Sequence, residues 1–85
     1  MMAIFTLGAD EIRIKQMEKI AEAWEFGGKY SNTEKLLIDA GKKKFDSVLV
    51  IDEEAIEDDA KIELNKLGVE IIGFRDKKVL EKKIL

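Results

Sequence analysis

Six carboxylates follow directly on a short apolar segment in the middle of the chain. The segment is Ser47 to Ile51, and the acids after it are Asp52, Glu53, Glu54, Glu57, Asp58 and Asp59. The point just beyond a buried parallel strand is where open α/β sheets hold their ligands. Carboxylates at such a point would suit Mg²⁺ and phosphoryl transfer. One interpretation of the sequence is therefore a magnesium-dependent site built from Asp10, Asp52 and Glu53.

The alternative interpretation of the same acids is structural. Carboxylates collect in the first turn of a helix because the helix dipole and the free amides favour them, each by about 0.3–1 kcal/mol. The acids from Glu53 to Asp58 stand where a helix start needs them. A metal site would need further acids from other strand ends, and only Asp10 and Glu11 qualify. We favour the helix start over the metal site.

The composition excludes several kinds of chemistry. The chain of 85 residues has no cysteine and no histidine. Disulfides, thiolate nucleophiles, imidazole bases and the usual zinc ligands are therefore excluded, and we expect no cofactor. The segment Gly27-Gly28-Lys29 lacks the spacing of a phosphate loop and follows a predicted helix, so we interpret it as a helix end.

The net charge of −3 is unevenly distributed. Residues 45–64 carry eight acids and one base, whereas residues 65–85 carry six bases and three acids. The acidic block disfavours nucleic acid, and the basic part is too mixed to form a clear phosphate-binding patch. Charged residues make up 39% of the chain with one Gln and two Asn, a pattern seen in proteins of heat-loving organisms, whereas the absence of Pro points the other way.

The location follows from hydropathy. No apolar run reaches the roughly 18–20 residues of a membrane span, and no basic segment followed by an apolar one opens the sequence. We therefore expect a cytosolic protein without a membrane segment.

Apolar patterning predicts the elements that must position these residues. Apolar runs at residues 2–7, 47–51 and 69–74 predict strands, with a very short edge strand or a loop at Lys29-Tyr30. A first helix is capped by Asp10 and has an apolar face of Met17, Ile20, Ala21 and Trp24.

Two further helices have clear boundaries. Ser31 and Glu34 read as a capping box that opens the second helix, and Gly41 closes it. The third helix ends at Gly68 and has an inward face of Ile56, Ala60, Leu64 and Leu67. The lysines Lys42-Lys43-Lys44 stand at a helix end, where cations are favourable.

This order of elements predicts the fold and a contact surface. Residues 1–85 form one α/β domain, a three-layer sandwich with a mostly parallel sheet of three to four strands and helices on both faces. A chain of this size buries only about 60–65% of its unfolded surface, so a partner would help. A last helix from Asp76 offers an apolar contact surface for a second copy or a protein partner, made of Val79, Leu80, Ile84 and Leu85. The alternative is that these residues pack on their own sheet.

Over roughly residues 3 to 74 the chain resembles the catalytic domain of serine recombinases, the resolvase and invertase family. The segments that carry the likeness are "LLIDAGKKKFDSVLVID" and "LNKLGVEII". The residues that perform the family's chemistry are missing. Ala9 stands where that family has its nucleophilic serine, and Asp52 to Asp58 stands where it has phosphate-binding arginines. The resemblance therefore implies a degenerate domain without strand-transfer activity.

A second resemblance is to the C-terminal domain of release factors and the related kink-turn-binding ribosomal proteins. It rests on "NTEKLLIDAGKKKFDSVLVIDEE" and "LNKLGVEIIGFRDKKVLEKKIL". In the RNA-binding members of that group the helix start resembling Ser31 to Lys35 contacts RNA. The resemblance implies RNA-contacting roles for Asn32, Glu34 and Lys35.

From the sequence we predict a non-catalytic, recombinase-like module for protein interaction or regulation. The alternatives are an RNA-binding module and a Mg²⁺-dependent phosphoryl-transfer enzyme.

Overall fold

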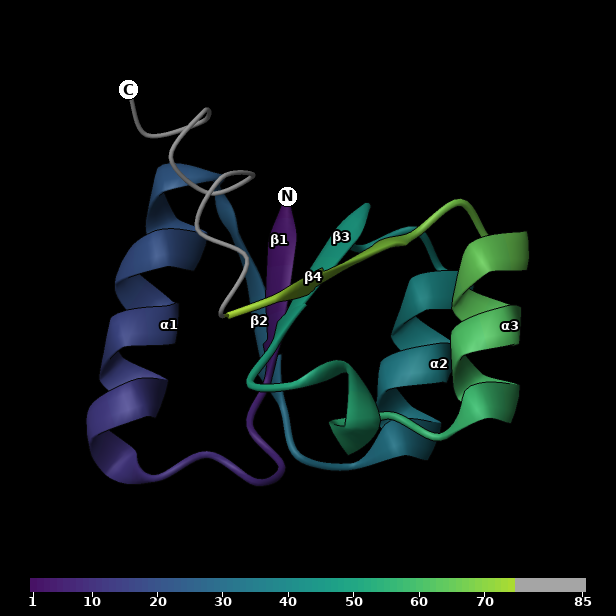
Figure 1. The fold of residues 1–85 in the computed structure, drawn as a ribbon. Helices are drawn as coiled ribbons and strands as arrows, with labels where there is room; N and C mark the ends of the chain where they lie inside the picture. Colours follow the sequence, from purple (N-terminus) through teal and green to yellow (C-terminus); the bar gives the residue numbers. More distant parts are fainter. Residues whose placement is uncertain (75–85) are drawn as a thin grey trace.

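The computed structural model describes residues 1–74, and within them strands and helices alternate along the chain (Figure 1). In chain order the elements are β1 (Met2–Phe5), α1 (Glu11–Ala23), β2 (Phe26–Tyr30), α2 (Thr33–Gly41), β3 (Ser47–Val50), a 3₁₀ turn (Glu53–Ala55), α3 (Asp58–Lys66) and β4 (Glu70–Gly73). The predicted last helix and its contact residues Val79, Leu80, Ile84 and Leu85 lie outside the described residues.

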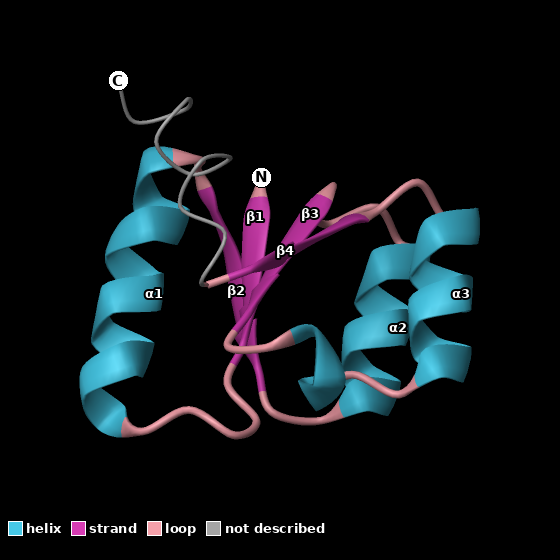
Figure 2. Cartoon of the chain, viewed as in Figure 1, coloured by secondary structure: helices cyan, strands magenta, loops and turns pink. Residues whose placement is uncertain are grey.

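The strands form one parallel sheet in the order β2-β1-β3-β4. Helix α1 covers one face of this sheet, and α2 and α3 lie together on the other (Figure 2). The connections between parallel strands place helices on the faces of the sheet, and parallel sheets therefore occur almost only with both faces covered. The predicted three-layer α/β sandwich is confirmed.

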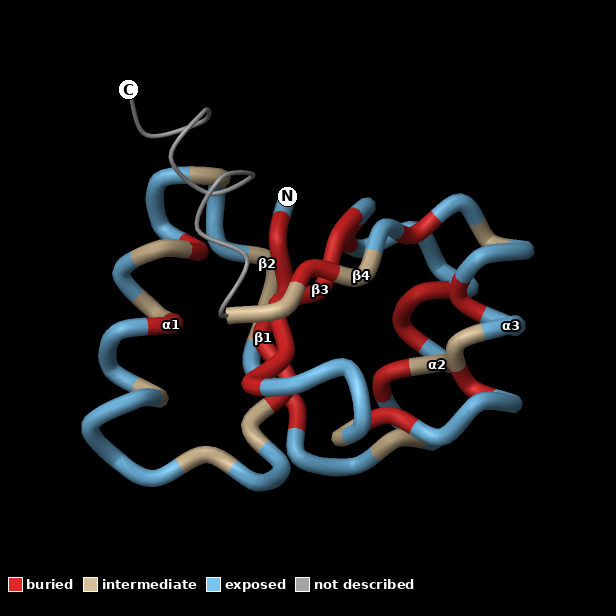
Figure 3. Tube along the Cα trace, in the orientation of Figure 1, coloured by how far each residue is buried: buried red, intermediate tan, exposed pale blue. Residues whose placement is uncertain are grey.

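Two apolar cores lie on the two faces of the sheet. Ala3 and Phe5 of β1 point into the core beneath α2 and α3, whereas Met2 and Ile4 point into the core beneath α1. Successive side chains of a strand point to opposite faces, which explains why a strand covered on both sides is continuously apolar. Both inner strands, β1 and β3, are buried along their whole length (Figure 3).

Helix α1 forms as its pattern predicts. The Asp10 carboxylate accepts a 2.8 Å hydrogen bond from the Arg13 amide and so caps the helix. Met17 and Ala21 are buried, and Ile20 and Trp24 pack against the same core.

The predicted end of this helix is wrong. The helix stops at Ala23, and Glu25 makes the turn with a left-handed φ of 67°. Gly27 and Gly28 lie inside the edge strand β2 instead. A Cβ at Gly27 would lie 3.0 Å from the Met2 carbonyl carbon, so glycine is required there by the close approach of β1 and β2.

The predicted capping box of α2 is also wrong. Helix α2 begins at Thr33, and its N-cap is Asn32, whose side chain accepts a hydrogen bond from the Lys35 amide at 3.1 Å. Asn caps a helix as well as Ser does. Because Ser31 and Asn32 are neighbours, the sequence did not show which of the two is the N-cap and therefore where α2 begins. Gly41 is the last helical residue, and Lys43 makes the left-handed turn after it with φ of 59°.

The acids after β3 begin two elements and not one. The Asp52 carboxylate accepts a 3.1 Å hydrogen bond from the Glu54 amide and caps the 3₁₀ turn. Ile56 is buried between this turn and α3, so it does not belong to the helix as predicted. Gly68 follows α3 with φ of 79°, in agreement with its predicted role as the helix stop.

Candidate functional site

The strand order places a topological switch point between β1 and β3. The connection after β1 leads to α1 on one face, and the connection after β3 leads to α3 on the other. In open α/β sheets ligands bind where two connections diverge in this way, beyond the carboxyl ends of the strands. The two connections come close together at Gly8 and Ile51, because a Cβ added at Gly8 would lie 3.5 Å from the Ile51 Cγ2. Leu7 beside them is 51% exposed.

The acidic connection after β3 forms one side of this edge. Its six carboxylates are all exposed, and they are Asp52, Glu53, Glu54, Glu57, Asp58 and Asp59. Asp52 caps the 3₁₀ turn, whereas Asp58 and Asp59 stand in the first turn of α3. These positions agree with the interpretation of the acids as helix starts. Asp58 also lies 3.8 Å from the Lys61 ammonium.

The alternative magnesium set is not assembled. The Asp10 carboxylate is engaged by Arg13, which donates from its amide at 2.8 Å and from its guanidinium at 2.6 Å. The amide hydrogen bond, helped by the nearby positive charge, holds the pKa of Asp10 below its usual value. Across residues 1–74 no three acids converge closely enough to hold a metal ion, so Asp10, Asp52 and Glu53 do not form a ligand group.

The residues of the RNA alternative lie at the start of α2, after β2. The Asn32 side-chain oxygen is occupied as the helix cap, whereas Glu34 and Lys35 are exposed in the first turn. Their exposure leaves them accessible to a ligand. The capping bond already accounts for Asn32 without one.

The sequence patterns do not predict a buried polar cluster that Tyr30, Asp39 and Lys44 form. The Tyr30 hydroxyl at the end of β2 donates a 2.6 Å hydrogen bond to the Asp39 carboxylate of α2, and the Lys44 ammonium lies 3.7 Å from the same carboxylate. Asp39 is only 7% exposed. The signal that could have found it is a carboxylate among the inward-facing residues Leu36 and Ala40 of α2, because a buried charge needs a partner.

This environment shifts the pKa values of both groups. Burial, followed by the hydrogen bond to Asp39, raises the pKa of Tyr30 to about 12. The hydrogen bond from Tyr30 and the neighbouring lysine charges lower the pKa of Asp39. Both groups therefore keep one protonation state across the neutral range, and the cluster ties α2 to the edge strand β2.

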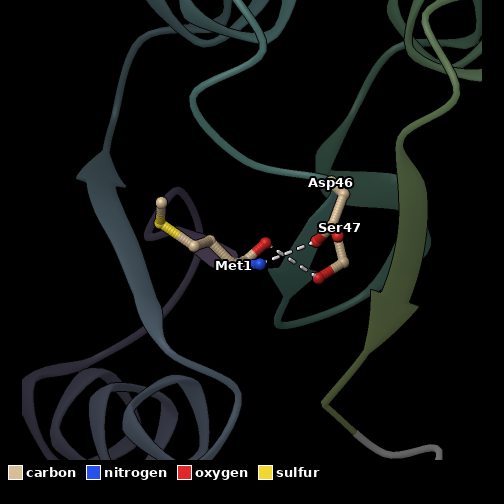
Figure 4. A network of polar contacts seen from close by, with 3 residues as sticks. All are labelled: Met1, Asp46 and Ser47. Carbon is tan, nitrogen blue, oxygen red and sulfur yellow. Dashed lines mark hydrogen bonds and ion pairs between the residues drawn. The ribbon is translucent and has the colours of Figure 1, made fainter.

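A second polar network lies at the amino ends of the two inner strands, β1 and β3 (Figure 4). The Met1 amino group pairs with the Asp46 carboxylate at 2.9 Å. The Met1 carbonyl accepts from the Asp46 amide at 3.0 Å, the Ser47 amide at 3.3 Å and the Ser47 hydroxyl at 3.4 Å. These contacts join the start of β1 to the start of β3.

Two hollows lie beside this network. One of about 380 Å³ is lined by Met1, Ala40, Lys43, Phe45, Asp46, Leu67 and Gly68. The other, of about 330 Å³, is lined by Met1, Trp24, Asp46, Ser47, Gly68 and Glu70. Ala40 and Phe45 are 1% and 4% exposed, so these two residues offer little apolar surface to a ligand in the larger hollow.

No family model or curated protein matches this chain, and no solved structure does. Its function must therefore be inferred from its own residues. Among the helices of residues 1–74, none has both the length and the apolar character to cross a membrane.

Proposed function

We propose that this chain is a non-catalytic, recombinase-like α/β module that binds a protein partner through the carboxyl edge of its sheet. The partner surface that fits this edge is basic. The cytosolic location expected from the sequence remains part of the proposal.

The observation that carries the proposal is the exposed acidic connection beside the switch point. Six exposed carboxylates stand between β3 and the first turn of α3, and Lys61 is the base paired with one of them. A surface of one charge sign attracts a partner of the opposite sign and raises its rate of association. The same charges repel phosphate, which argues for a protein and against a nucleic acid.

The recombinase resemblance supports a role without catalysis. Ala9 stands in the connection after β1, at the position that the resemblance assigns to a nucleophile, and an alanine has no atom that attacks phosphorus. The connection after β3 carries acids where that family would carry arginines. Carboxylates stand in place of the guanidiniums, whose paired N–H donors match the geometry of phosphate.

A labelled oligolysine peptide is a suitable probe of this edge. We expect the wild type to bind it at low salt and to release it at high salt. The triple variant Asp52→Asn, Glu53→Gln and Glu54→Gln should bind it several-fold more weakly. Asn at position 52 keeps a capping side chain, so the fold is preserved.

The matched control removes the same charge at the amino ends of the strands, by Glu22→Gln, Glu25→Gln and Glu70→Gln, all of which are exposed. Equal binding by both triple variants, or no binding by the wild type, would reject the acidic edge as the contact. Salt-dependent binding of a structured RNA hairpin by the wild type would instead support the RNA alternative at Asn32, Glu34 and Lys35.

A further inference from the structure

The outer sides of α2 and α3 carry the same pattern of three residues. On α2 the pattern is Glu34, Ile38 and the C-cap residue Lys42, at intervals of four, and on α3 it is Asp58, Ile62 and Lys66 at the same intervals. Residues four apart lie on one face of a helix, one above the other. All six are exposed. We call these six residues the paired stripes.

The isoleucines of the paired stripes are unusually exposed for their type. Ile38 is 58% exposed and Ile62 is 54% exposed. Each lies on the side of its helix away from the core, because the buried residues flank it at two positions on either side: Leu36 and Ala40 on α2, Ala60 and Leu64 on α3.

The two helices present this pattern as one layer. They pack against each other, run side by side in the same direction, and each has nine residues (Figure 1). Ile38 and Ile62 stand near the middles of the two helices. The acids therefore lie at one end of the layer, the lysines at the other and the isoleucines between them.

The helix dipole explains only part of this pattern. It favours acids in the first turn and lysines in the last. It does not explain an exposed isoleucine halfway between them on both helices. A single exposed apolar residue is ordinary, whereas two on neighbouring helices with the same charged flanks form a self-complementary surface.

We propose that the paired stripes are the interface of a twofold dimer of this chain. A twofold axis that lies across both helices at the level of the isoleucines turns the layer end for end. Ile38 then meets Ile38 of the partner subunit, and Ile62 meets Ile62 of the partner subunit. Glu34 meets Lys42 of the partner subunit, and Asp58 meets Lys66 of the partner subunit. Each charge pair occurs twice, as a twofold interface requires.

Charge complementarity selects this antiparallel arrangement over a parallel one. In a parallel arrangement acids would face acids and lysines would face lysines, which is unfavourable. Within the monomer Asp58 already lies 3.8 Å from Lys61, but Asp58 is 95% exposed. An exposed pair of this kind contributes little, so it does not compete strongly with the interface.

The interface is small, and the dimer is expected to be weak. A nine-residue helix is about 14 Å long, and packed helices lie about 8–10 Å apart. Two such helices bury less than a standard protein interface, so the dimer should form in a concentration-dependent manner.

Sedimentation equilibrium over a range of concentrations tests the apolar centre. We expect the wild type to dimerise at moderate salt. Ile38→Gln with Ile62→Gln should weaken dimerisation by about tenfold or more, which corresponds to about 1.4 kcal/mol. Ile12→Gln is the matched control, because Ile12 is 71% exposed on α1 and lies outside the paired stripes. Circular dichroism melting establishes that each variant is folded.

A pair of charge variants tests the arrangement itself. The variant Glu34→Lys with Asp58→Lys carries only cations at the flanks, and Lys42→Glu with Lys66→Glu carries only anions. Each should be monomeric alone, and an equimolar mixture should form a heterodimer in which every flank is paired. Glu11→Lys with Glu22→Lys makes the same change in net charge on α1 and should dimerise as the wild type does.

Three outcomes would overturn the proposal. They are a wild type that stays monomeric at every concentration, a dimer that the isoleucine variant leaves intact, and charge variants that remain monomeric when mixed. The acidic-edge variants of the proposed function leave the paired stripes intact, so failure of one proposal is distinguishable from failure of the other.

Discussion

The Tyr30 hydroxyl donates a 2.6 Å hydrogen bond to the Asp39 carboxylate across the boundary between β2 and α2. The two residues are 8% and 7% exposed, so the bond is shielded from water. The Tyr30 ring lies over Gly28, where a Cβ would come within 3.0 Å of it, and 5.5 Å from the Phe45 ring. The edge strand is therefore held to α2 by a buried polar contact within an apolar setting.

Removing the tyrosine hydroxyl should destabilise the fold. In Tyr30→Phe the Asp39 carboxylate loses its buried donor and keeps only the Lys44 ammonium at 3.7 Å. Leaving a buried acceptor without its partner costs about 1–3 kcal/mol. Urea unfolding measures the loss. The double variant with Asp39→Ala should lose less than the sum of the two single variants, and strict additivity would show that the bond contributes nothing.

The same bond should make stability depend on alkaline pH. The pKa of Tyr30 is about 12 when folded and 10.0 when unfolded, so folding favours the protonated hydroxyl. Its contribution is complete below pH 10 and is lost as the pH rises towards 12. We expect the difference in unfolding free energy between wild type and Tyr30→Phe to stay constant at neutral pH and to shrink in that window. A difference that is unchanged at pH 12 would contradict the shift.

Asp39 should give the opposite dependence in acid. Its pKa is lowered in the folded state from 3.8, so folding favours the ionised carboxylate. Its contribution is present above the unfolded pKa and is lost as the pH falls through the lower folded value. The wild type should therefore lose more stability below pH 4 than Asp39→Asn does, as measured by chemical unfolding at each pH. Parallel acid profiles would exclude Asp39 as the cause.

Two glycine substitutions should have effects of opposite sign. In Gly27→Ala the new Cβ would lie 3.0 Å from both the Met2 carbonyl carbon and the Phe45 Cβ, so backbone must move, at a cost of about 1–3 kcal/mol. Gly41→Ala is the control, because its Cβ would meet nothing within 4 Å at the end of α2. It should stabilise the chain by about 0.5–1 kcal/mol. Thermal melting distinguishes the two, and equal melting temperatures would contradict the close approach.

The capping residue of α2 can be tested by neighbouring substitutions. Asn32→Ala removes the side chain that accepts from the Lys35 amide and should cost about 0.5–2 kcal/mol. Asn32→Asp keeps an acceptor and should retain most of the stability. Ser31→Ala should have little effect, because Ser31 precedes the N-cap. A larger loss for Ser31→Ala than for Asn32→Ala would restore the capping box that the sequence suggests.

Periodicity alone determined where the main elements lie. Met17 and Ala21 share one helix face because residues four apart must, and they are buried as that spacing predicts. The run Val48 to Ile51 is apolar at successive positions, which only an inner strand covered on both faces can accommodate. These patterns depend only on the spacing of residues within one element, so they can be read from the sequence before the packing of the elements is known.

Only the tertiary structure determined the contacts between residues of different elements. Gly27 looks like a helix end, and only the approach of β1 shows that it lies in a strand where no side chain fits. Tyr30 and Asp39 are nine positions apart, and they meet because α2 crosses back over the edge strand. The stripes centred on Ile38 and Ile62 became one surface only when α3 packed beside α2. Each of these features depends on how closely two elements approach each other in space. That approach cannot be derived from the spacing of residues along the chain.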